Sequence, residues 1–139
     1  MRPPADNFRK EIRHMAKTFA LVFGAVYLLV GILGFVLPSP LLGLFGVNLL
    51  HNVVHLLIGA AWLVAATAAP MGENSSRVVS QVIGVVLVLL AIVGFVAPGI
   101  LKDLITAGAD PLADNLLHLV TGALALYIGF GTRAELAAA

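Results

Sequence analysis

The stretch HNVVHLLIG, residues 51–59, recurs as DNLLHLVTG, residues 114–122, so both copies fit the pattern His/Asp-Asn-x-x-His-Leu-x-x-Gly. Each copy lies at the start of a long apolar run, where polar side chains are costly and usually have a partner or a role. The repeat therefore indicates how the chain is built and where its most unusual chemistry lies. It does not name a reaction.

The composition is that of an integral membrane protein in contact with a lipid bilayer. Of 139 residues, 60% are hydrophobic and 11% are charged, whereas soluble domains carry about 45–50% apolar and about 25% charged residues. The mean hydropathy is +1.05. A net charge of +1 gives no support for a nucleic-acid partner. The absence of cysteine excludes disulfides, thiolate metal sites and a cysteine nucleophile.

Four apolar runs are long enough to cross the membrane, since about 20 helical residues span a hydrocarbon core of about 30 Å. Proline-containing segments separate the runs, and Asp110 precedes Pro111 as an expected N-cap of the last one. The predicted spans are residues 18–37, 48–69, 78–97 and 111–131. We expect a basic segment at 1–17 before this membrane domain (18–131) and a short tail at 132–139 after it.

The basic residues predict the orientation of the spans. Seven of the eight Lys and Arg residues fall on one side of the predicted membrane, and only Lys102 falls on the other. The positive-inside rule then places both termini in the cytoplasm, with the chain in the inner (plasma) membrane.

A second repeat extends the first to a whole hairpin. GFVLP at residues 34–38 is matched by GFVAP at residues 94–98, an offset of 60, and Gly24 pairs with Gly84 at the same offset. The fold class predicted is an all-α four-helix membrane bundle built from a duplicated two-helix hairpin. Like-oriented copies imply a pseudo-two-fold axis along the membrane normal. Small residues that let helices approach closely are expected at Gly24, Gly31, Gly34, Gly59, Gly84, Gly94 and Gly122.

Helical periodicity brings the polar residues of the second and fourth spans onto one inward face. This polar cluster comprises Asn48, His51, Asn52, His55, Asp114, Asn115 and His118. The favoured interpretation is structural: hydrogen bonds between helices fix the register of the bundle. Position 51 is His where its repeat equivalent, 114, is Asp, so we expect these two side chains to meet across the axis as an ion pair or a charge-assisted hydrogen bond. His55 and His118 are expected to point into the bundle.

Two alternatives remain open for this cluster. His55 and His118 could be axial ligands of a haem, or His51, His55, His118 and Asp114 could bind a divalent metal. A small transporter or a proton-conducting protein is the other alternative, although no continuous polar route follows His55 or His118 along their spans. No nucleophile elbow, paired carboxylates or phosphate-binding loop occurs, so an enzyme is not expected.

The string LGLFGVN, residues 42–48, leads into the first histidine motif, and the Gly34-Phe35 turn and Asp114-Asn115-x-x-His118-Leu119 accompany it. Together they resemble a bacterial four-span family catalogued as domain of unknown function 4383, over roughly residues 19–131. The resemblance implies a small multi-span membrane protein without an established activity. The leading hypothesis is therefore a non-enzymatic accessory or structural subunit, with a membrane-protein partner or as a homo-oligomer.

Overall fold

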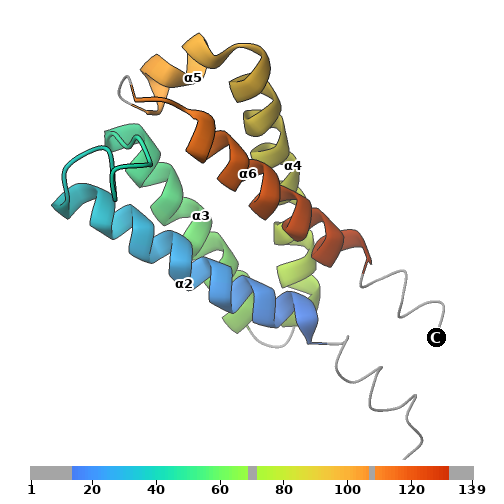
Figure 1. Ribbon diagram of the computed structural model, residues 1–139. Coiled ribbons are helices and arrows are strands. Elements are labelled where there is room, and N and C mark those ends of the chain that lie inside the picture. Colours follow the sequence, from blue (N-terminus) through green and yellow to red (C-terminus); the bar gives the residue numbers. More distant parts are fainter. Residues whose placement is uncertain (1–13, 69–71, 107–108, 132–139) are drawn as a thin grey trace, which may run out of the picture.

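The computed structural model describes residues 14–68, 72–106 and 109–131, which form helices and no β-strand (Figure 1). The helices in chain order are α2 (Met15–Val36), α3 (Leu49–Thr67), α4 (Gly72–Val96), α5 (Pro98–Leu104) and α6 (Leu112–Leu126), which continues as a π-helix, η1 (Tyr127–Gly131). Four of these segments are long and apolar enough to cross a membrane. The all-helical fold with four spans is therefore confirmed. The predicted segment 1–17 lies outside the described residues except for positions 14–17, and the predicted tail, 132–139, lies wholly outside them.

Local sequence explains where the helices begin. The side chain of Asn48 accepts a hydrogen bond from the backbone N–H of His51 at 2.9 Å, which caps α3. Asp110 accepts from the backbone N–H of Leu112 at 2.9 Å, although α6 itself begins one residue later than expected. The helix α4 begins at Gly72, six residues before the predicted start at 78, because its first turns are polar and hydropathy does not register them.

The helices pack as two pairs, α2 with α3 and α4 with α6, which lie side by side in Figure 1. In the first pair, a Cβ added to Gly59 would lie 2.6 Å from the backbone N of Leu28, and one added to Gly24 would lie 2.9 Å from Leu63. Gly84 and Gly122 make contacts of the same kind in the second pair. Glycines therefore set the close approach in both pairs, while a two-fold axis relating the pairs stays a prediction.

Aromatic residues of α2 pack around Trp62 of α3 in the first pair. The ring of Trp62 is fully buried, and Phe19, Phe23 and Tyr27 pack edge-on against it with centroids 5.2–6.2 Å away. The indole Nε1–H of Trp62 donates to Ser80 Oγ of α4 at 3.0 Å, which joins the two pairs. Outward-facing Leu, Val and Ile side chains remain exposed along all four long helices, as a surface in contact with lipid requires.

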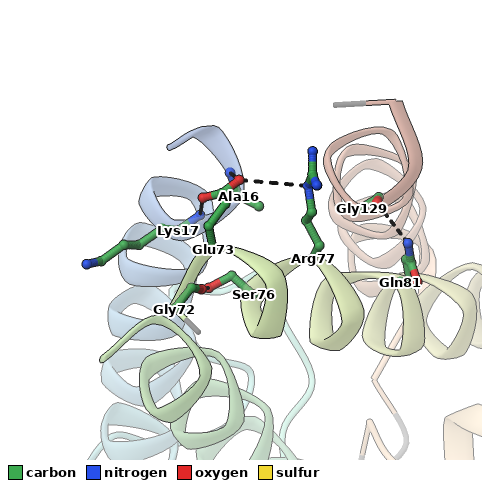
Figure 2. Close-up of polar contacts among 8 residues, drawn as sticks. All are labelled: Ala16, Lys17, Gly72, Glu73, Ser76, Arg77, Gln81 and Gly129. Carbon is green, nitrogen blue, oxygen red and sulfur yellow. Dashed lines mark hydrogen bonds and ion pairs between the residues drawn. The ribbon is translucent and has the colours of Figure 1, made fainter. Parts of the chain in front are cut away.

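Polar contacts tie the elements at the end of the bundle where α2 and α4 begin (Figure 2). The carboxylate of Glu73 accepts from the backbone N–H groups of Ala16 at 3.2 Å and Lys17 at 2.8 Å, so α4 caps the start of α2. Arg77 Nε lies 3.9 Å from Glu73 Oε1. Gln81 Nε2 donates to the carbonyl of Gly129 at 2.8 Å, within the π-helix. Residues 37–48, 105–106 and 109–111 and helix α5 lie at the opposite end, here named the loop end.

Candidate metal site at the loop end

The first turns of α3 and α6 bring the predicted polar cluster together at the loop end. Asn48 is partly exposed, and the other six members of the cluster are buried. His51 and His55 stand one turn apart on α3, and His118 lies on α6. The side chains of His51, His55 and His118 are only 4–6% exposed, so all three point into the bundle.

These three imidazoles, the histidine triad, converge on one point. One ring nitrogen from each lies within 4.8 Å of the other two. The ring centroids of His51 and His55 are 4.6 Å apart, and those of His51 and His118 are 5.9 Å apart. Within the part of the chain that the structure describes, four ring nitrogens have no hydrogen-bond partner: His51 Nε2, both nitrogens of His55, and His118 Nδ1. Buried polar atoms normally have partners, which include ordered water molecules and bound ions, so these nitrogens are available to bind a ligand.

A glycine backbone fixes the orientation of His51. Its Nδ1 lies 2.9 Å from the carbonyl oxygen of Gly46. A carbonyl can only accept a hydrogen bond, so Nδ1 carries the proton and Nε2 keeps its lone pair. The backbone N–H of Gly46 donates to Asp114 Oδ2 at 3.1 Å. Gly46 therefore links His51 to Asp114. The direct ion pair or hydrogen bond between these two side chains, which the sequence predicted, does not form among the described residues.

The loop between α2 and α3 brings Gly46 into this position. Residues 41–45 close a tight turn, in which Leu41 and Phe45 exchange backbone hydrogen bonds and Gly43 has a φ of +73°. Gly46 then lies against Thr106 and Ala109 of the second loop, where a Cβ would fall 2.8 Å from that of Ala109 and closer still to Thr106. Only glycine fits at this junction of the two loops.

The asparagines of the repeat have a packing role. The amide of Asn52 lies on Gly34 of α2 and that of Asn115 lies on Gly94 of α4, so closely that a Cβ on either glycine would overlap the amide oxygen. They therefore face the partner helix of their own pair rather than bridging to the histidines. The glycines allow a polar side chain to lie flat between two helices.

The histidine triad borders a cavity of about 230 Å³. Its other walls come from α3, α4 and the residue after α5, and they are apolar: Leu50, Val54, Ile58, Val86, Leu87, Leu90 and Ile105. Pockets that take drug-sized ligands have volumes of about 300–1,000 Å³, and a haem is at least that large. The cavity is smaller than that range, and the haem alternative stays a prediction.

Two residues that sequence reasoning missed contribute to this site. The ring of Tyr27 stacks on His55 with centroids 4.8 Å apart, which limits rotation of that imidazole. Tyr27 could have been noticed in the sequence because it is the only residue with an aromatic hydroxyl group in the first predicted span. Gly46, which holds both His51 and Asp114, was visible only as part of the LGLFGVN string.

Four apolar helices around a buried polar cluster define a multi-pass membrane protein of the helix-bundle class. The chain belongs to the family described as Domain of unknown function (DUF4383), which matches residues 17–131. Neither a curated protein nor a solved structure matches the chain.

Proposed function

We propose that this protein is a transition-metal-binding membrane protein whose ligands are His51, His55 and His118. The observation that carries the proposal is the convergence of three buried imidazoles with unpartnered nitrogens beside a cavity. Imidazole is the common protein ligand of Zn, Cu, Fe and Ni. The role proposed is binding rather than catalysis, because the described walls of the cavity carry no nucleophile or acid besides the imidazoles.

The distances are compatible with a site that closes on its ion. Nitrogens bound to one tetrahedral metal at about 2.0–2.1 Å lie about 3.3–3.4 Å apart, whereas the three ligand atoms lie within 4.8 Å of one another. The ligand nitrogens must therefore approach one another by at most about 1.5 Å. The adjoining cavity leaves room for such side-chain rotation, and the ring of Tyr27 keeps His55 within the cluster.

The contact between His51 and Gly46 supports the same proposal. Metal-binding histidines almost always donate their second ring N–H to a carbonyl or carboxylate, which fixes the tautomer and directs the other nitrogen at the ion. His51 donates Nδ1–H to Gly46, and Asp114 holds Gly46 in turn. Asp114 then acts as a positioning residue rather than as the direct ligand considered from the sequence.

The test is metal content of the full chain, purified in mild detergent without a polyhistidine tag. After stripping with a chelator and reloading, elemental analysis should give one ion per chain. His55→Phe keeps a ring against Tyr27 but removes both nitrogens, and it should weaken binding at least tenfold. The matched control is His14→Asn, because His14 is exposed and precedes α2, outside the cluster. A wild-type protein that retains no ion, or a His55→Phe variant that binds like wild type, contradicts the proposal.

A second candidate function is the structural one, a non-enzymatic accessory subunit or a self-associating protein. The packing of Asn52 on Gly34 and of Asn115 on Gly94 favours it, because these contacts contribute to the bundle without any ligand. Here the partner would be another membrane protein or a second copy of the chain. Native mass analysis from mild detergent separates the two candidates: a metal-free oligomer or heteromeric complex favours the structural role, and a metal-loaded monomer favours metal binding.

For the orientation, we propose both termini in the cytoplasm of a plasma-membrane protein. Supporting this, the start of α2 and the end of η1 lie at the same end of the bundle (Figure 1). That end also carries Lys17 and Arg77, while Lys102 lies in α5 at the loop end. The histidine triad would then open toward the outer side. Reporter fusions to each terminus, active only in the cytoplasm or only outside it, test this orientation.

A further inference from the structure

We propose that the ion held by the histidine triad is monovalent copper, Cu(I); this inference rests on the metal-binding function proposed above. It follows from the charge and the number of donors around His51, His55 and His118. It requires no redox step, since the ion enters and leaves in the same oxidation state.

The first argument is charge. The three imidazoles are neutral donors, and no carboxylate or thiolate borders the cavity among the described residues. The cost of moving an ion from water into a medium of low dielectric constant grows with the square of its charge. A divalent ion at this position would need two compensating negative charges. A monovalent ion needs one.

Asp114 supplies that single charge. Its side chain is 3% exposed and lies at the same end of the bundle, joined to His51 through Gly46. Its side chain accepts a hydrogen bond from the backbone N–H of Gly46 at 3.1 Å. A single positive charge on the histidine triad therefore balances the carboxylate of Asp114.

The second argument is coordination number. The described lining of the cavity offers three nitrogen ligands and otherwise only Leu, Val and Ile side chains. Zn²⁺ in proteins is almost always four-coordinate, so it would need a water molecule or an anion in an apolar environment. Copper binds imidazole well, and its trigonal sites in proteins are formed by two imidazoles and a thiolate, the place that a third imidazole takes here. Three imidazoles complete the shell of Cu(I) without a fourth ligand.

The experiment measures Cu(I) and Zn²⁺ binding to the same detergent-solubilised, untagged full chain. Cu(I) is kept reduced with ascorbate and titrated against a coloured Cu(I) chelator, and Zn²⁺ is titrated against a fluorescent indicator. We expect one Cu(I) per chain, bound at least tenfold more tightly than Zn²⁺. X-ray absorption of the copper form should show three nitrogen neighbours.

Asp114→Asn tests the charge argument, because the amide oxygen can still accept from Gly46 while the negative charge is lost. Cu(I) affinity should fall about 10–100-fold, the usual effect of changing an outer-shell partner, while the melting temperature of the metal-free protein stays within error of wild type. His14→Asn should change neither value. Zn²⁺ binding that matches or exceeds Cu(I) binding, with loss in His55→Phe, overturns the copper assignment and leaves the metal-binding function intact. Binding of neither ion overturns both, and an unchanged Cu(I) affinity in Asp114→Asn overturns the charge argument.

Discussion

Substitution of Gly59 by Ala tests the packing of the first helix pair. A Cβ at this position would lie 2.6 Å from the backbone N of Leu28 and 2.8 Å from the carbonyl O of Gly24. Both atoms belong to the backbone of α2, so no side chain can rotate out of the way. Ordinary contact begins at 3.4 Å, and α2 and α3 must therefore move apart locally by about 0.6–0.8 Å.

The magnitude follows from that displacement. A gap of 0.5–1 Å removes about a quarter to a half of the dispersion energy of each contact it opens, and overpacking of a close-packed interior typically costs about 1–3 kcal/mol. Alanine is favoured over glycine within a helix by about 1 kcal/mol, which offsets part of this cost. We expect Gly59→Ala to lower the free energy of unfolding by about 1–2 kcal/mol.

Two further glycines provide a graded comparison. At Gly122, in the second pair, the nearest backbone atom lies 2.9 Å from the added Cβ, so Gly122→Ala should cost less than Gly59→Ala. At Gly99 no atom lies within 4 Å, and Gly99→Ala should be neutral or stabilising. Unfolding in mixed micelles of mild detergent and dodecyl sulfate, followed by the fluorescence of the single tryptophan, Trp62, gives the three values. A Gly59→Ala protein as stable as Gly99→Ala would refute the reasoning.

Three other substitutions test polar contacts by the same unfolding assay. Ser80→Ala should lower the free energy of unfolding by about 1–3 kcal/mol, because the buried Nε1–H of Trp62 loses its acceptor. Surface substitutions usually change this free energy by less than about 0.5 kcal/mol, so a change below that value would mean that the indole finds another partner. Asn48→Ala should cost about 1–2 kcal/mol, because it removes both the α3 cap and the hydrogen bond from Asn48 Nδ2 to the carbonyl of Leu104, whereas Asn48→Ser, which keeps a capping oxygen, should recover part of the loss. Glu73→Gln should cost a few tenths to about 1 kcal/mol by removing a negative charge from the start of α2, and the cost should shrink at high salt; a salt-independent loss would contradict an electrostatic cause.

The spans could be predicted because a chain in lipid must satisfy its backbone polar groups within each helix, so apolar length alone indicates a helix. Apolar length does not predict helical segments that contain polar residues. The first turns of α4 carry Glu73 and Arg77, and α5 is too short and too mixed to stand out by hydropathy. The π-helix η1 also could not be predicted. The carbonyl of Gly129 within it accepts a hydrogen bond from the side chain of Gln81, which is far away in the sequence.

The candidate site was predictable at the level of a helix face and not at the level of contacts. Periodicity placed His51, His55 and His118 on inward faces, because residues three and four apart share one side of a helix. Their convergence depends on how α3 and α6 are rotated about their axes, which no local pattern determines. The link from His51 to Asp114 depends on Gly46, and its position follows from the fold of two loops that meet only in the assembled bundle.

The pairing of α2 with α3 and of α4 with α6 has a consequence for how the chain is made. Each pair consists of long helices that neighbour one another in chain order, so the glycine contacts of the first pair involve only residues before 68. The first hairpin can therefore pack in the bilayer while the ribosome is still synthesising the second. Joining of Trp62 to Ser80 and closure of the two loops around Gly46 belong to a later docking step. This arrangement allows the two hairpins to insert one after the other, and the histidine triad forms only when α3 and α6 have come together.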